Sequence, residues 1–233
     1  MGSTVAVERV ATAHSPRGET VLSRREDGTL ELRVNGVFVM DTAHTASERA
    51  LARNALDAFH GSPGSARDGT RVLIGGLGLG FTLHEVLGYS EVASVVVSEI
   101  EPAVVEWFLQ GLVPEVAADR HDDRVTLDTA EITESVSAQR DSTLDVLLLD
   151  VDNGPGYLVR SENASVYGTG FLRQCRDKLA PGGLLAVWSA NPAPELAETV
   201  REVFGSVEQR AVPVTLGSLE TEYHLYTGRI GAN

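Results

Sequence analysis

The residues with the clearest chemical potential are three alternate glycines and a carboxylate that follows them. Gly76, Gly78 and Gly80 stand in the segment RVLIGGLGLGF, directly after a short apolar run, and Glu99 ends the next apolar run, ASVVVSE. Glycines let a backbone approach a ligand closely, and a carboxylate about 20 residues beyond them can accept hydrogen bonds from a ribose diol. We therefore expect a nucleoside-type ligand at these residues, with Ile100 beside Glu99 in the same site.

The spacing of the glycines excludes two common nucleotide sites. A dinucleotide fingerprint that begins at Gly76 and Gly78 needs a third glycine at position 81, where the chain has Phe81. A P-loop needs a Gly-Lys-Ser/Thr sequence, but the only lysine in the chain is Lys178. The pattern that remains, G-x-G-x-G, is typical of enzymes that bind S-adenosylmethionine or a relative of it.

The adenine side of such a ligand has two candidate acids. Glu131 follows the third predicted strand at the start of a helix, where its carboxylate could accept a hydrogen bond from an amino group, and Asp128 is the alternative. A carboxylate at a helix start is also favoured by the helix dipole without any ligand. The ribose side is similarly open, because Glu101 lies on the same strand face as Glu99, which we prefer for its position at the strand end.

The fourth predicted strand, LDVLLLD, delivers Asp150 to the same edge of the sheet, and Asp152 and Asn153 follow it. A carboxylate there can hold a cationic amine, orient it and accept its proton as a carbon–nitrogen bond forms. We take Asp150 as the candidate catalytic residue, and Asp152, Asn153 and Tyr157 as candidate substrate contacts. The alternative is that Asp150 only caps the loop by accepting hydrogen bonds from backbone N–H groups.

The elements that position these residues alternate between strand and helix from residue 71 onwards. The pattern predicts strands at 71–75, 93–99, 124–128, 144–150 and 183–189, and helices at 81–88, 102–110, 131–138, 169–180 and 193–204. Two strands with no helix between them, within 206–214 and 222–229, end the chain. The predicted fold is α/β: a Rossmann-like, doubly wound and mostly parallel sheet with a terminal antiparallel strand pair.

A small N-terminal β-hairpin sheet precedes this domain. Asp27-Gly28 and Asn35-Gly36 separate short β-type runs, so that residues 19–41 are expected to form a three-stranded meander. The neighbouring segments are a loosely ordered lead-in at 1–18, a helix at 45–59 and a Gly-, Ser- and Pro-rich linker at 61–69. We accordingly expect two domains, a small one at 1–60 and a cofactor domain at 61–233.

The composition limits the function classes. The 233 residues carry a formal net charge of −14, which opposes nucleic-acid binding and mildly favours a cationic small molecule. Cys175 is the only cysteine, so we expect a cytoplasmic protein. The six histidines lack metal-ligand spacing, and we expect no metal. No apolar run approaches the ~18 residues of a membrane span and no secretory signal is evident, so we expect no membrane partner.

These residues together resemble the spermidine synthase-like group of S-adenosylmethionine-type transferases. The resemblance implies that the glycine loop and Glu99 bind the donor, that Glu131 contacts its adenine, and that Asp150 is the catalytic aspartate. By analogy of fold it also allows a homodimer joined at exposed hairpin edges. The resemblance covers residues 19–228, and its motifs are NGVFV at 35–39, GGLGLGF at 75–81, VSEIEP at 97–102 and LAPGG at 179–183.

The chain departs from that group at positions that recognise polyamines. Leu79 is taken to stand where aminopropyltransferases of the group hold a donor amino group with an aspartate, and Val39 replaces a substrate-side glutamine. Ala46-Ser47 replaces a Tyr-His pair before Glu48, and Asn153 replaces a second acid. The features of the donor site are kept, whereas those of the polyamine site are largely lost.

Three functions remain open from the sequence. We expect foremost methyl transfer from S-adenosylmethionine to a small acceptor, with a cationic amine favoured. The second is an aminopropyltransferase that makes a polyamine from decarboxylated S-adenosylmethionine. The third is a nucleoside-binding member of the group without catalysis, such as a sensor or partner subunit. The acceptor pocket is expected between the hairpin sheet and the loop at 151–168.

Overall fold

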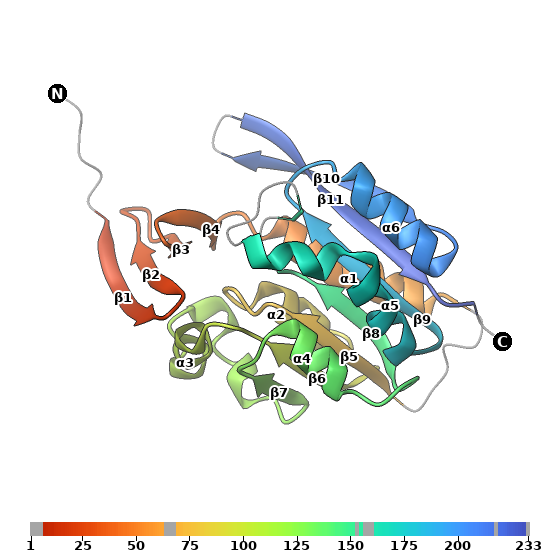
Figure 1. The fold of residues 1–233 in the computed structure, drawn as a ribbon. Coiled ribbons are helices and arrows are strands. Elements are labelled where there is room, and N and C mark those ends of the chain that lie inside the picture. The colour runs from red at the N-terminus through yellow and green to blue at the C-terminus, as the bar shows by residue number, and fades with distance from the viewer. Residues whose placement is uncertain (1–6, 63–68, 152–153, 156–160, 217–218, 232–233) are drawn as a thin grey trace.

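The main body of the protein is a seven-stranded sheet with the strand order β10-β11-β9-β8-β5-β6-β7 (Figure 1). The structure is a computed structural model, and it describes residues 7–62, 69–151, 154–155, 161–216 and 219–231. The strands from β9 to β7 run parallel, while β11 is antiparallel to β9 and β10 is antiparallel to β11. The seven strands are β5 (Thr70–Gly75), β6 (Val92–Ser98), β7 (Val125–Asp128), β8 (Leu144–Leu149), β9 (Leu179–Ser189), β10 (Glu208–Leu216) and β11 (Leu219–Arg229). The predicted parallel sheet with a terminal antiparallel pair is confirmed.

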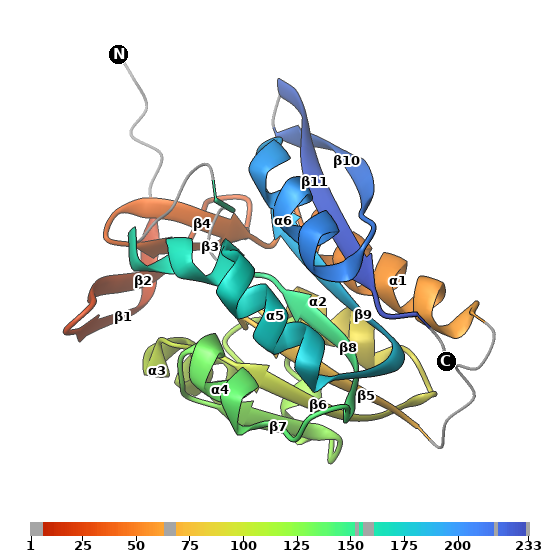
Figure 2. The same cartoon turned by 45° about the vertical axis from the view of Figure 1, so that its right-hand side comes forward.

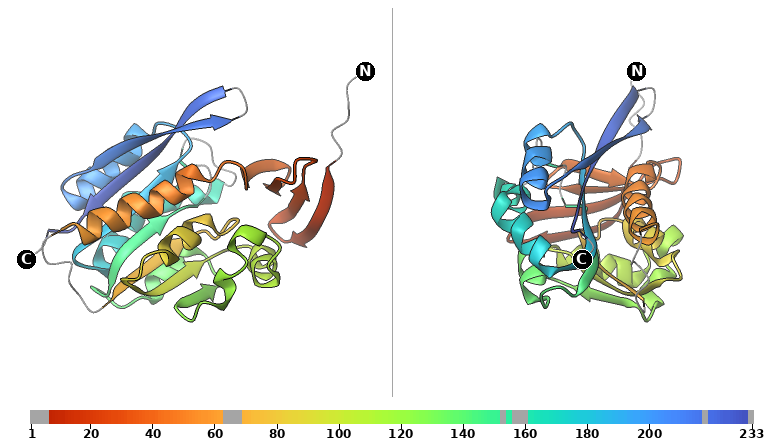
Figure 3. Two further views of the ribbon diagram at one scale, coloured as in Figure 1. Left: turned by 180° about the vertical axis from the view of Figure 1, so that it is seen from behind. Right: turned by 90° about the vertical axis from the view of Figure 1, so that its right-hand side faces the viewer.

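Helices cover both faces of this sheet (Figure 3). Side chains of α1, α2 and α3 share one buried core with one face of the sheet, and side chains of α4, α5 and α6 share a second core with the other face. The helices are α1 (Ala46–His60), α2 (Phe81–Leu87), α3 (Pro102–Gln110), α4 (Ile132–Ala138), α5 (Thr169–Lys178) and α6 (Pro194–Phe204), with short 3₁₀ turns at Pro114–Val116, Asp119–His121 and Ser161–Tyr167. The doubly wound arrangement is therefore confirmed.

The boundary between α5 and β9 differs from the prediction. The helix ends at Lys178 and the strand already begins at Leu179, whereas the sequence placed the strand start at residue 183. Leu179 pairs with Leu144 of β8, and the register between these strands shifts before Leu184 pairs with Val146. The Pro-Gly-Gly segment thus forms an irregularity inside the strand instead of a loop before it.

The small N-terminal sheet has four antiparallel strands instead of three. They are β1 (Glu8–Ser15), β2 (Gly18–Arg24), β3 (Leu30–Val34) and β4 (Val37–Asp41), in that order across the sheet. The predicted meander is confirmed, but the prediction of a loosely ordered lead-in is wrong for residues 8–15. The small and polar residues of β1 give a weak strand pattern, and backbone pairing of the strand with β2 decides its structure.

The small sheet stands beyond the carboxyl ends of the parallel strands (Figures 1 and 2). Its buried Leu22, Leu30 and Leu32 belong to the same core as α1 and the main sheet. Helix α1, which we grouped with the small sheet, lies along α2, and Arg53 of α1 pairs with Glu85 of α2 at 2.8 Å. This packing puts the small sheet opposite the strand ends that carry the predicted site residues.

Candidate active site

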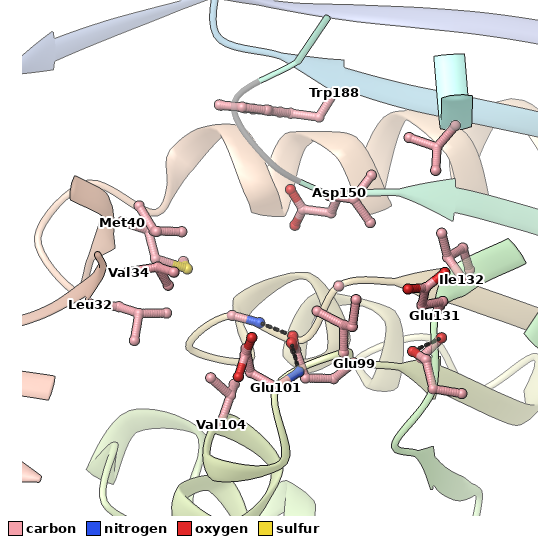
Figure 4. A pocket seen from close by; sticks show the side chains of 18 of the residues that line it. Leu32, Val34, Met40, Glu99, Glu101, Val104, Glu131, Ile132, Asp150 and Trp188 are labelled. Atoms are coloured by element: carbon pink, nitrogen blue, oxygen red, sulfur yellow. Dashed lines mark hydrogen bonds between the residues drawn. The ribbon is translucent and has the colours of Figure 1, made fainter. Parts of the chain in front are cut away.

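A cavity of about 330 Å³ lies between the carboxyl ends of the parallel strands and the small sheet. Figure 4 shows Glu99 and Asp150 at the strand ends, Met40 and Leu32 across from them on the small sheet, and Trp188 of β9 closing another side. Six of the predicted site residues line the cavity: Gly76, Gly78, Glu99, Ile100, Glu131 and Asp150. Asp152, Asn153 and Tyr157 lie outside the described residues.

The glycine loop is held in a backbone conformation that favours glycine. Gly76, Gly78 and Gly80 have φ angles of 89°, 52° and 92°, in the left-handed region. A Cβ atom on Gly76 would overlap the backbone carbonyl oxygen of Asp150, so this glycine brings the ends of two neighbouring strands together. Gly80 is not a lining residue, because it begins α2 and its α-carbon faces Val116 and Phe108.

Glu99 ties the glycine loop to the end of β6. Its carboxylate accepts hydrogen bonds from the backbone N–H groups of Leu77 at 2.9 Å and Glu101 at 2.8 Å, with a longer contact of 3.5 Å to Gly78 (Figure 4). Burial raises the pKa of Glu99, and these N–H groups oppose the rise. Because a carboxylate has about four lone-pair positions, one position remains for a ligand hydroxyl.

Glu101 and Asp128, the alternatives to Glu99 and Glu131 as ligand contacts, differ in whether they reach the cavity. Glu101 also lines the cavity, and its Oε2 accepts a hydrogen bond from Ser15 of the small sheet at 3.1 Å. Asp128 is not a lining residue, and its carboxylate accepts a hydrogen bond from the Ser135 hydroxyl at 2.5 Å. Glu131 stands at the N-terminal cap of α4, exposed, beside the cavity-lining Ile132.

Asp150 forms a carboxylate pair with Glu48 of α1, which the sequence analysis did not choose as a site residue. The Thr82 hydroxyl donates to Asp150 Oδ2 at 2.5 Å, and the Ser47 hydroxyl donates to Glu48 Oε2 at 2.6 Å. Burial raises the pKa of Asp150 to about 6. Burial, and then the charge of Asp150, raise the pKa of Glu48 to about 7.

A signal for Glu48 is nevertheless present in the sequence. Glu48 stands three residues before Leu51 and four before Ala52, both fully buried, so that it lies on the apolar face of α1. Burial of a carboxylate on the apolar face of a helix is costly, so such a residue needs either a compensating partner or a function that requires it. Met40 and Trp188, by contrast, are ordinary apolar residues of predicted strands, and no local pattern distinguishes them.

Gly78 of the glycine loop lines the cavity, whereas Leu79 does not. Leu79 is buried in the main core and is not a lining residue. The Met40 sulfur lies 3.2 Å from the Leu79 backbone nitrogen and 2.6 Å from the place where a Cβ of Gly78 would stand. The expectation that Leu79 occupies the place of a donor-binding aspartate is therefore corrected, since the cavity-facing place is taken by Gly78 with Met40 in front of it.

Neither a metal cluster nor a membrane helix is found in the part of the chain that the structure describes. No group of three or more His, Cys, Asp or Glu side chains there is arranged to hold a metal ion. No helix among those residues combines the length and the apolar character needed to cross a bilayer.

The fold and the site define a Rossmann-like domain of the class that binds nucleosides across the carboxyl ends of its strands. A sequence profile of the spermine/spermidine synthase domain matches residues 58–215. The chain thus belongs to the spermine/spermidine synthase family. The crystal structure of spermidine synthase from Thermotoga maritima superposes with a TM-score of 0.75 at 17% identity, over 97% of this chain and 74% of that one.

Transferases of two kinds are among the curated relatives of this chain. A polyamine aminopropyltransferase of Prochlorococcus marinus (strain NATL1A) is 28% identical over 140 residues, which make up 57% of this chain and 46% of the relative. Putrescine N-methyltransferase 1 of Nicotiana tabacum is 29% identical over 153 residues, 62% of this chain and 39% of the relative. Each of these two matches spans less than half of the relative's length.

Proposed function

We propose that this protein transfers the methyl group of S-adenosylmethionine to the nitrogen of a small amine. The observation that carries the proposal is the buried carboxylate pair, Asp150 and Glu48, beside a glycine loop of the type that binds S-adenosyl ligands. Two acids with raised pKa values at one cavity are poised to take up a cation and to exchange a proton. The relatives are named as a polyamine aminopropyltransferase and a putrescine N-methyltransferase, and both names agree with the transfer of a group to an amine.

The donor would lie along the strand ends. In the proposed arrangement the glycine loop contacts the sulfonium side, and the remaining lone-pair position of Glu99 accepts from the ribose. Ile100 and Ile132 pack against the adenine, and Glu131 accepts from its amino group. The residues of this arrangement that line the cavity are Gly76, Gly78, Glu99, Ile100, Glu131 and Ile132.

Asp150 would orient the acceptor and remove its proton. An ammonium group has no free lone pair, so it must lose a proton before its nitrogen can attack. Asp150, with a pKa of about 6, accepts that proton directly or passes it to Glu48. The nitrogen lone pair then forms a bond to the methyl carbon while the carbon–sulfur bond breaks, and the sulfonium becomes a neutral thioether. Alignment of nitrogen, carbon and sulfur supplies much of the rate.

Aminopropyl transfer from decarboxylated S-adenosylmethionine is the second candidate, favoured by the names of several relatives. That donor lacks the carboxylate that accompanies the amino group of S-adenosylmethionine, so its ammonium group needs a carboxylate of the protein near the glycine loop. In this chain the place is filled by Gly78 and the Met40 thioether, which offer no negative charge. For this reason we rank methyl transfer first.

The deciding experiment is calorimetric titration with each of the two donors, followed by product analysis in the presence of amines. We expect S-adenosylmethionine to bind more tightly, with S-adenosylhomocysteine as the product. The Asp150→Asn variant should bind the donor normally but lose turnover, because the amide cannot accept the proton. Tighter binding of the decarboxylated donor with formation of methylthioadenosine would favour the second candidate. Donor binding without any Asp150-dependent turnover would favour a non-catalytic protein.

A further inference from the structure

A second cavity, of about 530 Å³, adjoins the first one. The two cavities share four lining residues: Val39, Met40, Glu48 and Trp188. The rest of the second cavity's wall comes from Gly36 and β4, from His44 before α1, from Ala190 after β9 and from Tyr223 within β11. A molecule in the second cavity would therefore meet the donor of the first cavity at Glu48, beside Asp150.

Only one carboxylate of the second cavity is available to a ligand, among the lining residues that the structure describes. The two candidates are Asp41 and Glu48. Asp41 is 2% exposed, its Oδ2 pairs with Arg25 at 3.0 Å, and its Oδ1 lies 2.9 Å from both the backbone nitrogen and the ring Nδ1 of His44. Its charge is thus compensated within the small sheet. Glu48 remains, at the end next to Asp150.

Apart from His44, whose ring nitrogen lies against Asp41, the remaining wall of the second cavity is aromatic and apolar. The rings of Trp188 and Tyr223 pack with centroids 4.9 Å apart, and Phe38 and Val37 lie on the β4 side. Trp188 is 7% exposed, and its indole N–H finds no hydrogen-bond acceptor within the described part of the chain. Because the indole nitrogen is itself buried, Trp188 presents an aromatic surface to the cavity and no hydrogen-bond donor.

We propose that the acceptor is an amine with a single positive charge and a flat apolar body, preferably an aromatic ring. This inference rests on the proposed function. The ammonium group would lie between Glu48 and Asp150, and the body would pack on Trp188 and Tyr223. A diamine would instead place a second ammonium against this wall, where its burial without a carboxylate is unfavourable.

The test is calorimetric titration with three amines of similar length: 2-phenylethylamine, tyramine and 1,4-diaminobutane. Each is titrated into the protein alone and into the protein saturated with S-adenosylhomocysteine. We expect both aromatic amines to bind roughly tenfold more tightly than the diamine. Trp188→Ala should abolish this preference. Trp188→Phe, which keeps an aromatic ring, should retain most of it. Leu109→Ala, at an exposed position of α3, is the control and should change nothing.

The outcomes separate the inference from the proposed function. Tighter binding of 1,4-diaminobutane would overturn the inference but leave the proposed methyl transfer to an amine intact. Failure of every amine to bind while S-adenosylhomocysteine binds would overturn both. Failure of the nucleoside to bind, with Trp188-dependent binding of the aromatic amines, would overturn the proposed function but support the assignment of this cavity.

Discussion

At the scale of single residues, the carboxylate pair makes stability depend on pH. The pKa values of Asp150 and Glu48 are raised in the folded protein, to about 6 and about 7, from 3.8 and 4.5. Between these values the folded state holds more protons than the unfolded state, so stability falls as pH rises. The contribution of the pair is fully present below the unfolded pKa values and is lost as pH rises through 7.

The Glu48→Gln variant tests this dependence, because the amide stays neutral at every pH. We expect it to be more stable than the wild type at about pH 8, by on the order of 2 kcal/mol, with the difference shrinking toward about pH 5. Urea denaturation at both pH values measures it. Glu91→Gln, at an exposed carboxylate, is the matched control. An equal effect of Glu48→Gln at both pH values would contradict the assignment.

Gly76 and Gly28 form a matched pair for testing the glycine loop. Both have a φ near 90°, but a Cβ on Gly28 meets nothing within 4 Å, whereas one on Gly76 overlaps the backbone of Asp150. Gly28→Ala should cost about 1 kcal/mol of unfolding free energy, from the strained backbone alone. Gly76→Ala should cost about 3 kcal/mol or more and weaken donor binding, because the strand ends must separate. Equal costs in urea denaturation would show that the loop tolerates the displacement.

At the scale of elements, Met40 connects the small sheet to the glycine loop. It is a residue of β4, and its sulfur contacts the loop that begins α2. We expect Met40→Ala to weaken S-adenosylmethionine binding about fivefold, because the loop loses the side chain packed in front of Gly78. Met40→Leu, which keeps the volume, should bind nearly as the wild type does. Calorimetry distinguishes the two, and equal affinities for Met40→Ala and the wild type would show that the contact plays no part in binding.

At the scale of the whole molecule, the shared core predicts a single unfolding transition. Leu22, Leu30 and Leu32 of the small sheet are buried in the same core as α1 and the main sheet, so neither part exposes its core alone. S-adenosylhomocysteine at about 100 times its Kd should raise the Tm by roughly 5–10 °C, since binding adds about 2.7 kcal/mol. Calorimetric scans measure both. A separate early transition of the small sheet, or a shift no larger than that given by guanosine, would contradict this.

The local features of this protein can be predicted from its amino-acid sequence. The alternation of strands and helices follows from short-range patterns, and the conformation of the glycine loop follows from its glycines. Carboxylates such as Glu99 and Asp150 stand directly after buried strands, and parallel strands bring such ends to one edge. These predictions needed no knowledge of distant contacts.

The residues that face Glu99 and Asp150 across the cavity depend on how distant elements pack together. Met40 of β4 and Glu48 of α1 are far from Asp150 in the sequence, and both meet the site only because the small sheet and α1 pack beyond the strand ends. The interaction of Glu48 with Asp150 depends on the distance between α1 and the end of β8. The distance between β4 and the glycine loop likewise determines that Met40 lies in front of Gly78. Such distances are set by the packing of the core as a whole, which no local pattern records.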